Sequence, residues 1–122
     1  MQSFFGAAVA YGLSTLIGII RFRMRPFDSL GLDPIIDVEY PIKSFPSDHS
    51  SISFAFAFMV FLYNKKYGTI LLGIATLIAI GRILAGVHYF SDVVAGALVG
   101  ICGALLFYFF SKSRRISSWF RF

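Results

Sequence analysis

Two long stretches without a charged residue constrain this chain more than any other feature. Phe4–Ile20 runs for 17 residues and Val93–Phe110 for 18 residues without Asp, Glu, Lys or Arg. A helix rises ~1.5 Å per residue, and a bilayer core of ~30 Å requires about 17–25 helical residues. Both stretches are therefore long enough to cross a membrane as helices.

Two shorter apolar stretches, His49–Tyr63 and Tyr67–Ile80, lie between them. Because they are short for a crossing, we expect polar groups at their ends to dip below the membrane surface. None of the four stretches alternates between polar and apolar residues as the strands of a membrane barrel would. The sequence therefore predicts an all-α integral membrane bundle with four transmembrane helices, formed by residues 1–122 as one domain.

The overall composition excludes several other classes of protein. Hydrophobic residues make up 57% of the chain and charged residues 14%, which is too apolar for an ordinary soluble domain or a disordered one. A single cysteine, Cys102, excludes an internal disulfide and a cysteine-rich metal site. The net charge of +5 is too thinly spread to indicate nucleic-acid binding. Membrane lipids are the expected surroundings.

The charges also predict an orientation. With four crossings, the face that holds both termini and the turn between the second and third helices carries six basic residues, and the other face carries five. Two of those five, Arg25 and Arg82, are set aside because chemistry explains them below. Since the positive-inside rule counts basic residues, both termini are predicted to be cytoplasmic and the Arg21–Asp48 loop to lie outside the cell membrane.

Polar residues that membrane helices usually avoid gather at this outer face. Ionisable groups bordering a transmembrane segment cost ~2.5–3.5 kcal/mol on insertion scales, so they usually mark function. They form three clusters: Arg21, Arg23, Arg25 and Pro26; then Pro46, Ser47, Asp48 and His49; then Arg82, His88 and Asp92.

These side chains have the chemistry that phosphoryl transfer requires. Arginines bind phosphate through paired, charged hydrogen bonds, and Ser47 with the first amides of its helix makes an anion site. His88 and Asp92 are spaced i, i+4, so on a helix the carboxylate would hold one ring nitrogen and leave the other free to attack phosphorus. His49 would protonate the departing oxygen. This chemistry needs no metal or other cofactor.

The clusters resemble the three motifs of the type 2 phosphatidic acid phosphatase superfamily. Its motifs are Lys-x6-Arg-Pro, Pro-Ser-Gly-His and Ser-Arg-x5-His-x3-Asp. They correspond here to Gly18-x6-Arg25-Pro26, Pro46-Ser47-Asp48-His49 and Gly81-Arg82-x5-His88-x3-Asp92. The runs FPSDHS and GVHYFSDVVAG are most similar to the bacterial undecaprenyl-diphosphatase branch. The resemblance covers residues 18–100.

The resemblance implies a lipid phosphatase with a phosphohistidine intermediate. His88 would be the nucleophile, Asp92 its orienting partner, and His49 the acid and then the base. The implied substrate is undecaprenyl diphosphate, cleaved to undecaprenyl phosphate. Phosphatidic acid and phosphatidylglycerol phosphate stay open as alternatives, because the motifs contact only the phosphate. That phosphate would be held by Arg25, Arg82, Ser47 and the amide of Asp48.

Three positions depart from the motifs. Gly18 replaces a lysine, and Arg21, one helical turn later, is a candidate for supplying the missing charge. Gly81 replaces a serine, and Asp48 replaces a glycine. Members of this branch usually carry about two more helices before the first motif, so we expect either a minimal form or a chain without its N-terminal helices. A catalytically impaired homologue that serves as a membrane scaffold is therefore an alternative.

Several of these residues also have purely structural interpretations. Arg21 and Arg23 are equally well explained as interfacial anchors that extend to lipid headgroups. Ser47 or Asp48 would also suit a helix N-cap. Close helix packing explains the small residues Gly96 and Gly100 better than chemistry does.

Overall fold

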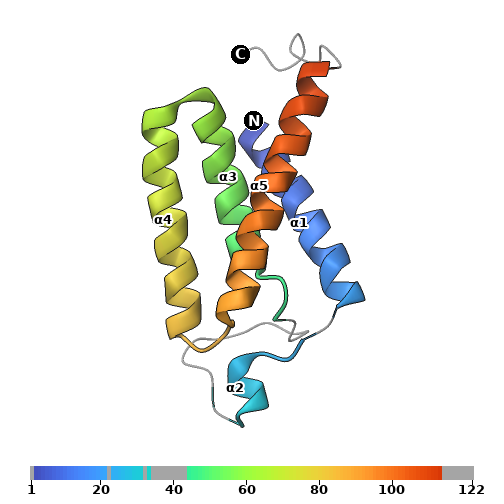
Figure 1. Ribbon diagram of the computed structural model, residues 1–122, viewed down its shortest axis with the longest axis vertical. Helices are drawn as coiled ribbons and strands as arrows, with labels where there is room; N and C mark the ends of the chain where they lie inside the picture. The colour runs from blue at the N-terminus through green and yellow to red at the C-terminus, as the bar shows by residue number, and fades with distance from the viewer. Residues whose placement is uncertain (1, 22, 32, 34–43, 114–122) are drawn as a thin grey trace.

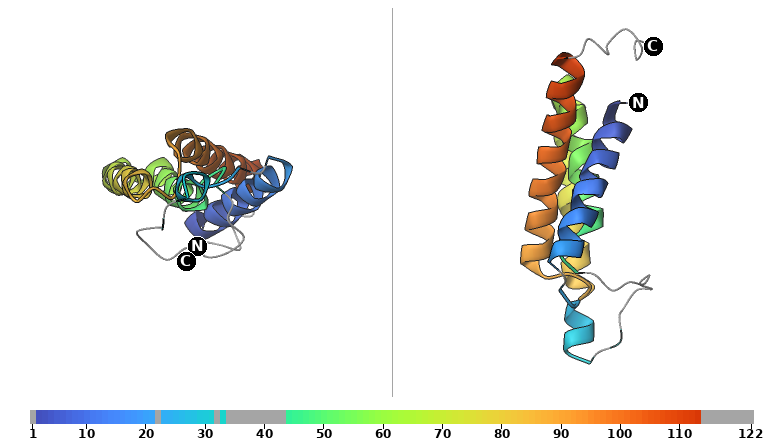
Figure 2. Two further views of the ribbon diagram at one scale, coloured as in Figure 1. Left: turned by 90° about the horizontal axis from the view of Figure 1, so that it is seen from below. Right: turned by 90° about the vertical axis from the view of Figure 1, so that its right-hand side faces the viewer.

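The computed structural model describes residues 2–21, 23–31, 33 and 44–113 of the chain. This described part contains five helices and no strand: α1 (Gln2–Ile20), α2 (Pro26–Ser29), α3 (Asp48–Tyr63), α4 (Lys65–Leu84) and α5 (Phe90–Ser113). The four long helices form a bundle, and α2 is a single turn beyond one end of it (Figure 1; Figure 2). The predicted all-α membrane bundle is confirmed.

The helices differ in how well they are suited to cross a bilayer. By length and composition, α1, α4 and α5 are long and apolar enough to do so. With 16 residues, α3 is shorter than a usual span, and it packs against all three of the others. The predicted stretch Tyr67–Ile80 lies within α4, which extends beyond it at both ends. Asn64 caps this helix by accepting a hydrogen bond from the amide of Tyr67 at 3.2 Å, which brings both preceding lysines into the first turn.

Small residues allow the central helices to approach closely. A Cβ built on Gly100 of α5 would lie 2.3 Å from the carbonyl oxygen of Ser51 in α3, and one on Gly103 would lie 3.0 Å from the Cα of Ala10 in α1. The close packing predicted for Gly96 and Gly100 is thus confirmed. On α1, the buried residues recur every fourth position, at Gly6, Ala10, Ser14 and Gly18.

The polar clusters fall at one end of the bundle. The start of α1, the α3–α4 turn and the end of α5 lie at the opposite end (Figure 1). We call the end that carries α2, the start of α3 and the α4–α5 turn the site end. This separation agrees with the grouping predicted from the sequence, whereas the membrane leaflet that each end faces stays a prediction. Part of the Arg21–Asp48 loop and residues 114–122 lie outside the described residues.

Candidate active site

Backbone hydrogen bonds bring three chain segments together at the site end. The amide of Ser47, in the loop before α3, donates to the carbonyl oxygen of Asp92 in the first turn of α5 at 3.0 Å. The amide of Ser44 donates to the carbonyl oxygen of Arg23, in the linker after α1, at 2.9 Å. The clusters that are far apart in the sequence are therefore neighbours in the fold.

Two arginines from different segments have buried donor atoms here: Arg25 is buried as a whole, and Arg82 is half-buried. Arg25 is 9% exposed, and Arg82 lies near the end of α4. Among the described residues, no acceptor lies within hydrogen-bond distance of Arg25 Nε, Arg25 Nη1 or Arg82 Nε. Burial and then the charge of Arg82 lower the pKa of Arg25. Since buried guanidinium donors are costly without an acceptor, this pair has the properties of an anion site.

Both histidines lie within electrostatic reach of the same two arginines. The charges of Arg25 and Arg82 act on His49, which is exposed in the first turn of α3, and on His88, which is 3% exposed in the α4–α5 turn. Burial, then Arg25 and Arg82, lowers the pKa of His88 to about 4. Its imidazole is therefore neutral near pH 7, so one ring nitrogen keeps a free electron pair.

His88 lies in the turn between α4 and α5, so it does not share a helix with Asp92, the condition under which their i, i+4 spacing would bring them into direct contact. Gly86, at a φ of 71°, follows the end of α4, and α5 begins only at Phe90. The Nδ1 atom of His88 lies 2.9 Å from the carbonyl oxygen of Ser44 and 4.0 Å from Asp92 Oδ2. The nearest partner of the ring is thus a main-chain carbonyl, with the carboxylate behind it.

Asp92 is fully buried and collects several donors. Its Oδ2 accepts hydrogen bonds from the Ser44 hydroxyl and, at 2.8 Å, from the amide of Tyr89. Its Oδ1 accepts from Arg23 Nη1 at 3.2 Å. The bond to Tyr89 has the form of a capping box, in which an acidic side chain in the first turn bonds back to the amide that precedes the helix. Asp92 therefore both starts α5 and links it to two other segments.

The opening of α3 combines a cap with a contact to α1. Ser47 is fully buried and is the N-cap residue, and its Oγ accepts from the amide of Ser50 at 3.4 Å. The carboxylate of Asp48 accepts a hydrogen bond from the Ser14 hydroxyl of α1. This contact gives a structural reason for an acidic residue in the second motif. A negative charge in the first turn also suits the helix dipole.

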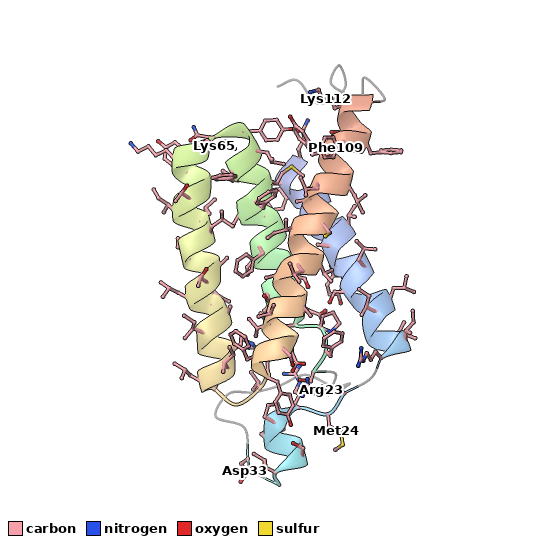
Figure 3. All side chains as sticks on the ribbon, in the orientation of Figure 1. Arg23, Met24, Asp33, Lys65, Phe109 and Lys112 are labelled. Carbon is pink, nitrogen blue, oxygen red and sulfur yellow. The ribbon has the colours of Figure 1, made fainter. Side chains whose placement is uncertain are left out.

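The arginines after α1 have different surroundings. Arg21 is exposed, and its guanidinium lies 5.9 Å from the ring centroid of Phe45. Arg23 donates to Ser91 Oγ at 2.7 Å and lies 4.0 Å from the ring centroid of Tyr89. Figure 3 shows Arg23 at the site end, close to the start of α5. Sequence reasoning gave Ser44 no place in the site, and it placed Arg23 in the first polar cluster without assigning it a role.

The two motif positions occupied by glycine differ in their surroundings. Gly18 lies on the buried stripe of α1, whereas Gly81 is exposed on α4, where a Cβ would meet no atom within 4 Å. Within the described ranges, no three His, Cys, Asp or Glu side chains gather in a way that could hold a metal ion.

Residues 1–116 match the family model described as the PAP2 superfamily. This chain belongs to the PAP2 superfamily. The matched range includes all three motif segments, which the fold brings together at the site end.

Curated relatives refine this assignment. Bacitracin transport permease protein BcrC of Bacillus licheniformis is 41% identical over 98 residues, covering 80% of this chain and 48% of that protein. Undecaprenyl-diphosphatase BcrC of Bacillus subtilis is 32% identical over 103 residues, covering 84% and 53%. Lipid A 4'-phosphatase of Bacteroides thetaiotaomicron is 36% identical over 96 residues, covering 71% and 42%. The resemblance to the undecaprenyl-diphosphatase branch is confirmed, and the chain spans about half the length of these relatives.

Proposed function

We propose that this protein is a membrane lipid phosphatase that hydrolyses undecaprenyl diphosphate to undecaprenyl phosphate. The observation that carries the proposal is a pair of arginines, Arg25 and Arg82, whose buried donor atoms meet no acceptor among the described residues and whose charges act on the neutral imidazole of His88. An anion is the ligand that such a pair lacks, and a nitrogen with a free electron pair is the nucleophile that phosphoryl transfer needs.

The reaction would proceed in two displacements at phosphorus. His88 Nε2 attacks the terminal phosphorus, the bond from phosphorus to the bridging oxygen breaks, and protonated His49 gives its proton to that oxygen. His49 then takes a proton from water, whose oxygen attacks the phosphohistidine and releases inorganic phosphate. Arg25 and Arg82 would neutralise the equatorial oxygens in both steps. The net reaction consumes one water and yields the lipid monophosphate and phosphate.

The lipid nature of the substrate is supported by the bundle and by the relatives. The outer faces of α1 and α4 carry exposed apolar side chains, among them Ile19 and Leu77, that would face bilayer lipid. Curated relatives are named as an undecaprenyl-diphosphatase and a lipid A 4'-phosphatase. We propose that the site end opens to the outer leaflet, where the diphosphate would lie. A reporter on the C-terminus that is active only outside the cytoplasm should stay silent.

Phosphate release from the purified chain in detergent tests the proposal. We expect turnover of undecaprenyl diphosphate, loss of turnover in His88→Ala, and no loss on adding a chelator. Lys66→Ala, an exposed residue at the opposite end of the bundle, is the matched control. Comparing undecaprenyl diphosphate with phosphatidic acid and phosphatidylglycerol phosphate decides the substrate. Activity that persists in His88→Ala would contradict the nucleophile assignment.

An impaired enzyme or scaffold is the second candidate, and Gly18 is the observation that favours it. A missing cationic contact costs ~2–4 kcal/mol of transition-state stabilisation, or about 10²–10³ in rate. Gly18 lies on the buried stripe of α1, in line with Ser14, whose hydroxyl contacts α3. A Gly18→Lys variant that releases phosphate far faster than the unchanged chain would indicate an impaired enzyme. Equal absence of turnover in both would favour a scaffold.

A further inference from the structure

Ser44 has three hydrogen-bonding groups, and each contacts a different part of the candidate site. Its amide donates to the carbonyl oxygen of Arg23 at 2.9 Å, its hydroxyl donates to Asp92 Oδ2, and its carbonyl oxygen lies 2.9 Å from His88 Nδ1. The residue is fully buried. Two bonds therefore hold the residue whose carbonyl faces the imidazole ring.

We propose that Ser44 is a positioning residue that holds the His88 ring and separates its Nδ1 from the Asp92 carboxylate. This inference rests on the proposed function, in which His88 is the nucleophile. A carbonyl oxygen can only accept, so the Nδ1 facing it carries the hydrogen and Nε2 keeps the electron pair. The hydroxyl of Ser44 meanwhile donates a hydrogen bond to Asp92 Oδ2, the carboxylate oxygen that lies 4.0 Å from His88 Nδ1.

The separation has a chemical consequence. A carboxylate bonded directly to Nδ1 would favour the protonated, non-nucleophilic imidazolium, whereas a neutral carbonyl does so less. The other charged groups acting on His88 are Arg25 from the linker and Arg82 from α4, and both also favour the neutral ring. Asp92 stays close enough to stabilise the positive charge that develops when Nε2 bonds to phosphorus.

Titration of His88 by NMR tests the proposal without relying on turnover. In a His49→Gln chain with a tag free of histidine, His88 is the single histidine. We expect an Nδ1-protonated ring that titrates well below 6.5. Adding Ser44→Ala should let Asp92 reach the ring and raise the His88 pKa by about one unit or more. Ser44→Thr, which keeps the hydroxyl, should restore the low value.

Ser51→Ala is the matched control. Ser51 is a fully buried serine at the same end of the bundle, but its hydroxyl donates to the carbonyl oxygen of Ser47 at 3.0 Å. This variant should leave the titration of His88 unchanged. In chains that retain His49, Ser44→Ala should lower kcat about tenfold to a hundredfold with little change in KM, because the nucleophile is misaligned.

The outcomes separate this inference from the proposed function. An unchanged His88 titration and tautomer in Ser44→Ala, whatever happens to turnover, would overturn the positioning role. The expected titration change in a chain that releases no phosphate from any lipid would support the positioning role and reject the phosphatase. If Ser44→Ala does not fold, Asp92→Asn decides. The Nδ1-protonated tautomer should persist there, and its loss would show that Asp92 holds the ring directly.

Discussion

Gly96 of α5 lies so close to Ser47 of α3 that a Cβ built on the glycine would be 2.6 Å from the serine's carbonyl oxygen. That oxygen belongs to the backbone of the α3 N-cap residue, so it cannot rotate away as a flexible side chain could. The same helix–helix contact sets the distance between the start of α3, which carries His49, and the start of α5, which follows His88. The close packing of α5 against α3 therefore also sets the geometry of the site.

Replacing this glycine tests the link. We expect Gly96→Ala to destabilise the fold by about 1–3 kcal/mol, because the added methyl group forces α5 away from α3. Phosphate release should fall more than stability alone explains, because the two histidines separate. Thermal unfolding in detergent and phosphate release at a temperature well below the midpoint measure the two effects. Gly73→Ala is the control, since a Cβ there meets no atom within 4 Å. Equal behaviour of the two variants would contradict the prediction.

The burial of Arg25 predicts a conflict between stability and activity. Arg25→Met removes a buried cation next to Arg82, so we expect the unfolding temperature to rise. The same change should lower phosphate release by about 10²–10³, because one of the groups that neutralise the transition state is gone.

Anion binding gives an independent measurement of the same site. Inorganic phosphate should raise the unfolding temperature of the unchanged chain by mass action, and it should not do so for Arg25→Met. Lys66→Met, an exposed cation at the other end, should keep the response. A phosphate response that survives in Arg25→Met would show that the anion binds elsewhere.

Much of the bundle could be predicted from the sequence, because uncharged stretches are a strong local signal. The predicted Val93–Phe110 lies wholly within α5, and the predicted His49–Tyr63 differs from α3 by one residue. The gathering of the polar clusters at one end followed from counting crossings. The starts of α4 and α5 were less well predicted, since capping by Asn64 and Asp92 extends both helices N-terminally into polar sequence.

The contacts inside the site could not be predicted in the same way. The roles of Ser44 and Arg23 depend on the path of the loop before α3, and a serine in a loop carries no sequence signal of its own. The spacing of His88 and Asp92 predicted a direct contact only if both lay on one helix, and the spacing alone did not show where that helix begins. Gly86 after the end of α4 was the available sign that the next helix begins later, since a glycine with positive φ commonly ends a helix.

The low pKa of His88 predicts how stability depends on pH. The folded chain holds this ring neutral down to about pH 4, whereas the unfolded chain takes up a proton near 6.5. Between these values the unfolded state binds more protons, so stability should be complete above about pH 6.5 and fall as the pH drops toward 4. The loss attributable to His88 should reach about 3 kcal/mol.

Comparison with His88→Gln isolates this contribution from that of the carboxylates. The unfolding temperature of the unchanged chain should fall more steeply between pH 6.5 and 4 than that of the variant. Below about pH 4 the two curves should run parallel, because His88 is then protonated in both states. Parallel curves over the whole range would contradict the low pKa.

Arg21 and Arg23 should differ in what they contribute to stability, although the sequence allowed the same interfacial role for both. The guanidinium of Arg23 bonds to Ser91 and to the buried carboxylate of Asp92, whereas Arg21 is exposed. Removing a donor from a buried carboxylate costs more than removing an exposed charge, although Arg23 is itself 43% exposed. We therefore expect Arg23→Ala to cost about 1–2 kcal/mol of stability and Arg21→Ala less than about 0.5 kcal/mol. Unfolding temperatures in one detergent measure both. Equal losses would mean that both arginines act as headgroup anchors. The hydrogen bonds from Arg23 to the start of α5 would then contribute little to stability.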